Sequence, residues 1–175
     1  MRGVKVTLLL AVVALLGAGF SACAGDGSED SDQSGAFRVQ GGDNSIQDYG
    51  EEADRSELAA AEAVLAGYLA ARAADDWEKQ CRYLAKATLK PLEQLAANSP
   101  QLQGKGCAAL LEELSDGIPA STRTDPMSAG LGSLRSEDDR AFALFHGSKG
   151  VDYFIPMSKE GEDWKVAALA PSEFP

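Results

Sequence analysis

The side chains that could carry out chemistry in this sequence are few and widely spaced. His146 is the single histidine among 175 residues, and Asp152 follows it after a short Gly-containing turn. A histidine can act as a general base near neutral pH, and a carboxylate in an apolar pocket can hold its proton for transfer. One imidazole excludes metal sites built on two histidines. The alternative for both residues is a partly exposed polar group at the end of a strand.

Four further polar side chains lie in segments that are otherwise apolar. Tyr68, Arg72 and Tyr83 stand in helical segments, and Tyr153 stands beside Asp152. Hydroxyl and guanidinium groups could orient a small ligand inside a pocket, although such residues also pack at the boundary of a core. The sequence therefore predicts one set of candidate ligand contacts, comprising Tyr68, Arg72, His146, Asp152 and Tyr153, and it predicts no catalytic residue.

Two carboxylate clusters could suggest a metal site. One is Glu112-Glu113 with Asp116, and the other is Glu137-Asp138-Asp139. Neither has the alternating ligand spacing of an EF-hand loop, and Glu137-Asp138-Asp139 stands where a tight turn before a strand is expected. No Gly-rich phosphate loop and no G-x-S-x-G motif occurs. We therefore predict no metal and no cofactor.

The charge balance argues against one large class of partners. The chain has 16 Lys and Arg against 27 Asp and Glu, for a formal net charge of −11. Nucleic-acid binding needs clustered basic side chains that displace counterions, and no basic stripe is present. The sequence predicts no nucleic-acid partner.

The first 22 residues have the pattern of an export signal. Arg2 and Lys5 precede an uncharged stretch from Val6 to Phe20 that is rich in Leu, Val and Ala. The sequence Phe20-Ser21-Ala22-Cys23 then resembles the lipobox of bacterial lipoproteins, although Phe20 replaces the usual Leu. The resemblance implies a signal peptide over residues 1–22 and a lipid on Cys23 that anchors the mature chain to a membrane. Two alternatives are cleavage after Ala24, which would release a secreted protein, and an uncut membrane anchor.

The cysteines and the charges fit an extracytoplasmic lipoprotein. If Cys23 carries the lipid, Cys81 and Cys107 remain as an even pair, which we expect to form a disulfide in an oxidising compartment. Residues 26–57 contain ten acids and two bases. We therefore expect residues 23–50 to form a disordered acidic tether and residues 51–175 to form the globular domain.

The first half of the domain has helical periodicity. Apolar residues spaced three and four apart predict a helix from Glu51 to about Ala74, and Asp75 is the expected N-cap of a second helix that carries Trp77 and Cys81. A third helix is expected over 91–97 and a fourth over 107–114.

The last third alternates with a period of two. Strands are expected over 140–146, 151–157 and 164–169, with a fourth over 129–135. A two-residue turn at Ser148-Lys149 would pair His146 with Val151 and place Asp152 opposite Phe145. Both faces of this antiparallel meander are apolar. The fold class is therefore α+β, with helices packed on a curved sheet.

Several residues carry a resemblance to a known fold. Tyr68-Leu69-Ala70, Asp76-Trp77, Cys81 with Tyr83-Leu84, and the segment Gly-Glu-Asp-Trp-Lys-Val at 161–166 resemble small bacterial lipoproteins of the nuclear transport factor 2-like superfamily, which includes ketosteroid isomerase-like enzymes. The resemblance covers about residues 55–170 and implies a cone-like fold.

Three functions are compatible with these features. The first is a lipid-anchored, non-catalytic module of the cell envelope that binds a protein or a small apolar ligand. The second is a small isomerase or cyclase that uses Asp152 or His146 inside an apolar cavity. The third is a structural envelope component. A shared fold cannot choose among them.

Overall fold

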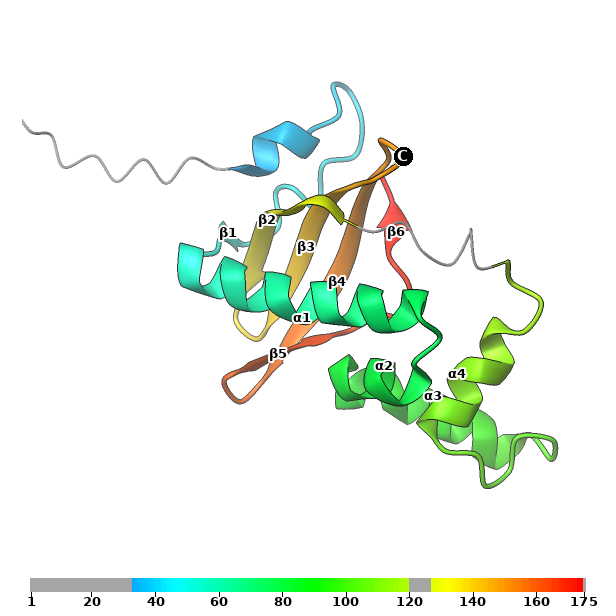
Figure 1. Cartoon of the computed structure of the whole chain (residues 1–175). Helices are drawn as coiled ribbons and strands as arrows, with labels where there is room; N and C mark the ends of the chain where they lie inside the picture. Colours follow the sequence, from blue (N-terminus) through cyan, green and yellow to red (C-terminus); the bar gives the residue numbers. More distant parts are fainter. Residues whose placement is uncertain (1–32, 120–126, 175) are drawn as a thin grey trace, which may run out of the picture.

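A computed structural model of the chain describes residues 33–119 and 127–174 (Figure 1). The expected signal peptide, Cys23 and the tether up to residue 32 lie outside the described residues. Within the described ranges the fold is α+β, as predicted, and no helix is both long and apolar enough to cross a membrane. The elements in chain order are η1 (Gln33–Phe37), β1 (Glu51–Glu52), α1 (Arg55–Ala73), α2 (Trp77–Tyr83), α3 (Lys86–Asn98), α4 (Cys107–Ser115), β2 (Met127–Glu137), β3 (Arg140–Gly147), β4 (Asp152–Glu160), β5 (Asp163–Val166) and β6 (Ser172–Glu173).

The long helix α1 lies across one face of the sheet, and its local chemistry sets both of its ends. Asp54 caps its start, because one carboxylate oxygen accepts hydrogen bonds from the Ser56 and Glu57 amides at 2.8 and 2.9 Å. At the other end Asp75 adopts a left-handed conformation (φ 54°), which turns the chain. The N-cap of α2 is therefore Asp76, which accepts from the Lys79 amide at 3.0 Å. The prediction of Asp75 as the N-cap was wrong by one residue.

Helix α3 begins earlier than the sequence pattern predicted. Pro91 was expected at its start but lies inside it. The start is fixed by tertiary contacts: the Lys86 amide donates to Glu160 Oε1 at 2.6 Å, and the Ala85 amide donates to the Val166 carbonyl at 2.9 Å. A cap supplied by a strand seventy residues later leaves no local signal in the sequence.

The strands form an open antiparallel sheet in the order β1-β2-β3-β4-β5, with β6 paired to β4 beyond the reach of β5. The predicted meander is present, but its register is shifted by one residue. His146 pairs with Asp152, where Val151 was expected. The cause is the turn, because the Gly147 amide donates to the Val151 carbonyl at 2.7 Å and Gly150 has a positive φ of 76°. Three residues therefore form the loop, which has glycine at the left-handed position.

The register decides which side chains share a face of the sheet. The face toward α1 carries Phe145, Ile155 and Met157, which are fully buried with Leu65 and Leu134 in the main core. The opposite face, here called the outer face, carries alternate residues of β3 and β4, namely Phe142, Leu144, His146, Asp152 and Phe154. Both faces are thus apolar, and both need a cover.

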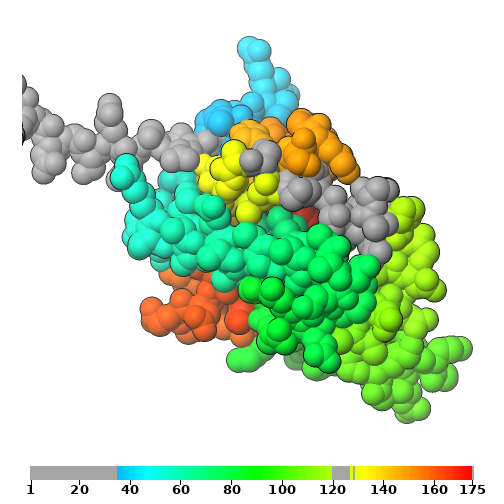
Figure 2. Space-filling model, viewed as in Figure 1, coloured from blue at the N-terminus to red at the C-terminus, as the bar shows by residue number. Residues whose placement is uncertain are grey.

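Residues 33–50 cover part of the outer face, so the prediction of disorder up to residue 50 is wrong for them. Phe37 is 3% exposed, Gln47 is fully buried, and the Tyr49 ring meets Phe142 edge-on at 4.9 Å. The segment lies next to the residues of the β3–β4 hairpin in the space-filling view (Figure 2). Its composition is polar and acidic, but a single buried phenylalanine contributes about 1.5–3 kcal/mol to packing.

Cys81 of α2 and Cys107 of α4 lie at disulfide distance, with their Cα atoms 6.2 Å apart. This separation is within the ordinary range for a disulfide. The link spans 26 positions and would hold together the ends of a segment that contains α3. Helices α2 to α4 pack on one another at one end of α1 (Figure 1).

Replacing both cysteines tests this link. We expect the double variant Cys81→Ser/Cys107→Ser to lose about 3.5 kcal/mol in the free energy of unfolding, because the unfolded chain regains the entropy of a 27-residue loop. Urea unfolding followed by circular dichroism measures the loss, and the wild-type chain under reducing conditions is the matched control. Alkylation of Cys81 and Cys107 in the folded chain without prior reduction would contradict the disulfide.

Candidate functional site

The predicted ligand contacts separate into two groups on opposite faces of the sheet. Tyr68 and Arg72 on α1, together with Tyr153, lie on the side of the main core, whereas His146 and Asp152 lie on the outer face. The one-residue shift in register separates Tyr153 from His146. The structure therefore does not bring the five residues into one site.

His146 and Asp152 form a hydrogen-bonded pair across two strands. The distance from His146 Nδ1 to Asp152 Oδ1 is 2.5 Å, and the two side chains are 44% and 37% exposed. The Phe37 ring stacks on the imidazole with centroids 4.5 Å apart and an interplanar angle of 18°. The pair is thus a half-exposed polar contact beneath an aromatic ring. It is not enclosed in an apolar cavity.

Tyr68 and Arg72 bind the backbone that follows β5. The Tyr68 hydroxyl donates to the Leu169 carbonyl at 2.7 Å, and Arg72 Nη1 donates to the same oxygen at 2.6 Å. Gln80 Nε2 in turn donates to the Tyr68 hydroxyl at 3.1 Å. Tyr68 is fully buried, and burial raises its pKa above the usual value. These side chains hold the C-terminal segment, and their polar groups are bonded within the chain.

The other two tyrosines pack against neighbouring residues. The Tyr153 ring stacks on its cross-strand partner Phe145, with centroids 5.5 Å apart. The Tyr83 hydroxyl lies so close to α1 that a Cβ atom at Gly67 would be 2.2 Å from it. Only a glycine at position 67 leaves room for this contact.

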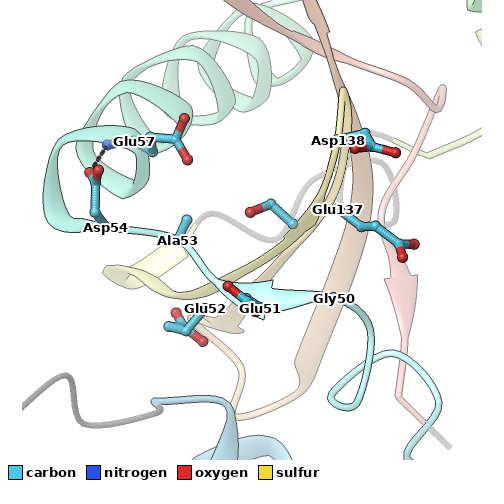
Figure 3. Close-up of a pocket in the computed structure, with 9 residues that line it drawn as sticks. Gly50, Glu51, Glu52, Ala53, Asp54, Glu57, Glu137 and Asp138 are labelled. Atoms are coloured by element: carbon cyan, nitrogen blue, oxygen red, sulfur yellow. Dashed lines mark hydrogen bonds between the residues drawn. The ribbon is translucent and has the colours of Figure 1, made fainter.

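An acidic cleft of about 550 Å³ lies where β1, the start of α1 and the β2–β3 turn meet (Figure 3). Several of its carboxylates have structural roles. Glu52 accepts hydrogen bonds from the Ser133 hydroxyl at 2.7 Å and the Leu134 amide at 3.1 Å. Hydrogen bonds from the Glu57 amide and the Ser56 side chain lower the pKa of Asp54. Two residues of the predicted 137–139 cluster, Glu137 and Asp138, form the exposed rim.

Glu57 also belongs to this cleft, and it pairs with a lysine of β4. The Lys159 ammonium donates to Glu57 Oε1, and this hydrogen bond raises the pKa of Lys159. The same ammonium lies 5.0 Å from the centroid of the Trp164 ring. This contact joins the first turn of α1 to the part of β4 that pairs with β5.

A second cleft, of about 680 Å³, lies between the start of α2 and α4. The half-buried Trp77 forms part of its wall, and the carboxylates of the predicted 112–116 cluster form much of its rim. One of these, Glu113, forms an ion pair with Lys105. Among the described residues, no group of three or more acidic, histidine or cysteine side chains could hold a metal ion.

Two buried residues of functional interest, Phe37 and Gln80, were missed in the sequence. Phe37 is the one aromatic residue between Asp26 and Asp48, and this isolation in a polar stretch was an available signal. Gln80 had no such signal, because its partner is a tyrosine on another helix.

The chain was compared with protein-family models, with curated proteins and with solved structures, and none of them matches. The architecture alone does not select an activity, because one fold hosts many functions. The function must therefore be argued from the residues of this chain.

The contact between Tyr68 and Leu169 can be tested by removing one oxygen atom. We expect Tyr68→Phe to lower the free energy of unfolding by about 1–3 kcal/mol, because Gln80 loses its buried acceptor and the Leu169 carbonyl loses a donor. Urea unfolding measures the change. Tyr83→Phe is the matched control, and we expect it to change stability by less than about 0.5 kcal/mol.

The raised pKa of Tyr68 predicts that the free energy of unfolding depends on pH in the alkaline range, and the same variant tests this. Unfolded Tyr68 releases its proton near pH 10, whereas folded Tyr68 keeps its proton to a higher pH. The stability that depends on protonated Tyr68 is therefore fully present below about pH 10, and it is lost as the pH rises further. The fall should be smaller in Tyr68→Phe; equal slopes in the two proteins would contradict the assignment.

Proposed function

We propose that this chain is an extracytoplasmic lipoprotein, anchored to a membrane by a lipid on Cys23, whose α+β domain binds a partner or a small ligand of the cell envelope without catalysing a reaction. The observation that carries the proposal is the pairing of cysteines. Cys81 and Cys107 lie at disulfide distance, and disulfides persist in oxidising compartments. Cys23 is then the odd cysteine, placed directly after an apolar stretch that has the pattern of an export signal.

The proposal extends to the fold family. The order of helices before an antiparallel sheet, with α1 across one face, supports a place in the nuclear transport factor 2-like superfamily. In such a cone-like fold a ligand would bind between the helices and the sheet. The sheet described here is open, and its helix-facing side is packed by side chains from both layers.

The filled interior argues against an isomerase-type pocket between α1 and the sheet. The space between α1 and the sheet is occupied by Leu65, Phe145, Ile155 and Met157, none of them more than 1% exposed. The isomerase-like alternative needs Asp152 or His146 inside an apolar cavity. Both residues lie on the outer face, where the side chains of His146 and Asp152 are 44% and 37% exposed, and not inside an apolar cavity.

Lipidation can be tested in a bacterium that processes lipoproteins. We expect the wild-type chain to take up an alkyne-labelled palmitate, to sediment with membranes, and to have a mature N-terminus at Cys23 by mass spectrometry. Cys23→Ser should abolish the label and the membrane association. Cys81→Ser/Cys107→Ser, which removes the other two cysteines, should keep both.

Two results would refute the anchor. One is a free N-terminus at Gly25, which shows ordinary secretion. The other is palmitate label that persists in Cys23→Ser.

A further inference from the structure

The segment that covers the outer face is held by one side chain near its N-terminal end. We call residues 33–48 the strap. The Phe37 ring fills a socket formed by Gly132 of β2, His146 of β3 and Phe174 after β6. Phe37 is 3% exposed, although its neighbours Ala36 and Arg38 are exposed. Phe37 is therefore the buried side chain of the strap at this end.

The socket is a narrow slot that accepts a flat aromatic ring. A Cβ atom at Gly132 would lie 2.6 Å from the Phe37 ring, so even a methyl group there would collide with it. On the other sides the ring stacks on His146 at 4.5 Å and meets Phe174 at 6.1 Å. A planar aromatic side chain can enter such a slot, and a branched aliphatic side chain fits it poorly.

The strap carries its own internal hydrogen bonds. Asn44 exchanges two of them with Val39, from the Val39 amide at 2.9 Å and to the Val39 carbonyl at 3.0 Å. Arg38 forms an ion pair with Asp48, and Gln47 Nε2 donates to the Phe37 carbonyl at 2.8 Å. These bonds can survive when the strap leaves the sheet, so it can move as a unit.

The strap ends at a firm attachment to the sheet. Arg135 donates to the Tyr49 carbonyl at 2.9 Å and to the Gly50 carbonyl at 2.6 Å. Gly50 lies so close to β2 that a Cβ atom would be 2.1 Å from the Ser136 carbonyl. Tyr49 and Gly50 are therefore the fixed end of the strap.

The closed strap also leaves a polar atom without a partner. Gln47 Oε1 is buried and has no hydrogen-bond partner among the described residues. A buried acceptor without a donor opposes the closed state, because water would satisfy it in the open state. This cost lowers the free energy that is needed to open the strap.

Opening would expose the two rings on which Phe37 packs, those of His146 and Phe174. Phe174 begins a row of aromatic rings on this face, because it lies 5.2 Å from Phe154, which lies 6.1 Å from Phe142. The His146–Asp152 pair lies at one end of the row. Aromatic rings with a polar group beside them are typical of protein-binding surfaces.

We propose that the strap is an autoinhibitory cover, and that the outer face binds a peptide segment with an aromatic side chain from an envelope protein when Phe37 leaves its socket. The chain itself supplies the evidence for this occupant, because the side chain that fits the socket is a phenylalanine presented by an exposed segment. The inference rests on the proposed binding function and specifies its partner.

A synthetic peptide of residues 33–48 serves as the probe. We expect a fluorescein-labelled peptide to bind the full-length Phe37→Ala chain about tenfold or more tighter than the wild-type chain, because the wild-type socket is occupied. The same peptide with Phe37→Ala should bind neither chain. Fluorescence anisotropy measures all four affinities.

The Gly132→Ala variant distinguishes peptide binding in the socket from nonspecific binding to apolar surface. This variant should release the strap, seen as faster hydrogen exchange over 33–48, while the blocked socket prevents peptide binding. Gly35→Ala is the matched control, because a Cβ atom at Gly35 has nothing within 4 Å. Continued slow exchange in β3 and β4 shows that each variant is folded.

Two results would overturn the proposal: equal affinity of the peptide for wild-type and Phe37→Ala chains, or equally tight binding to Gly132→Ala. The assay does not depend on the lipid. Loss of the Cys23 anchor would therefore refute the proposed localisation and leave this test intact, whereas a failed peptide assay would leave the anchor intact.

Discussion

The sheet of this protein is apolar on both faces, and most of the structure follows from the need to cover them. Alternation along β3 and β4 places Phe145 and Ile155 on one side and Leu144 and Phe154 on the other. Water is excluded from the first side by α1. On the second side the structure describes no α-helix, and two short segments cover it: the residues before β1, which begin with the 3-10 helix η1, and the residues after β5, which include β6. A cover made of short polar segments is less stable than a helix, because it buries little apolar surface per residue.

Contacts on the helix side of the sheet position the C-terminal segment that helps to cover the outer face. Tyr68 and Arg72 hold the Leu169 carbonyl on the helix side of the sheet, and the chain then pairs with β4 as β6. This path brings Phe174 onto Phe154 and against Phe37. A buried polar contact on one face thus positions an aromatic ring on the other. The residues that were expected to contact a ligand contribute to this arrangement from both sides.

The sequence predicted the elements of the fold better than their relative placement. Helical periodicity identified α1 and α4, and alternation identified β3 and β4, because these patterns are local. The register was missed because it depends on a three-residue turn that was interpreted as a two-residue turn. The start of α3 was missed because its cap comes from Glu160.

The role of Tyr68 could not be predicted, since its acceptor is a backbone carbonyl a hundred residues away, which any amino acid could supply. The packing of residues 33–50 was missed because an average over an acidic stretch conceals one buried phenylalanine.

The charge of the chain has a different meaning in this light. Ten acids lie between residues 26 and 57, and a domain with 17 acids and 12 bases follows. Part of the acidic stretch packs on the domain, so fewer residues separate the domain from the proposed anchor at Cys23 than composition predicted.

Phe37 covers the outer face by stacking on His146, and the account depends most on this contact. Proton NMR of the full chain tests the contact directly, because the chain has one histidine and therefore one set of imidazole signals. The account predicts nuclear Overhauser effects between the His146 ring protons and the Phe37 ring, together with imidazole signals shifted upfield by the ring current of Phe37. Imidazole signals at their random-coil positions, without such contacts to Phe37, would contradict it.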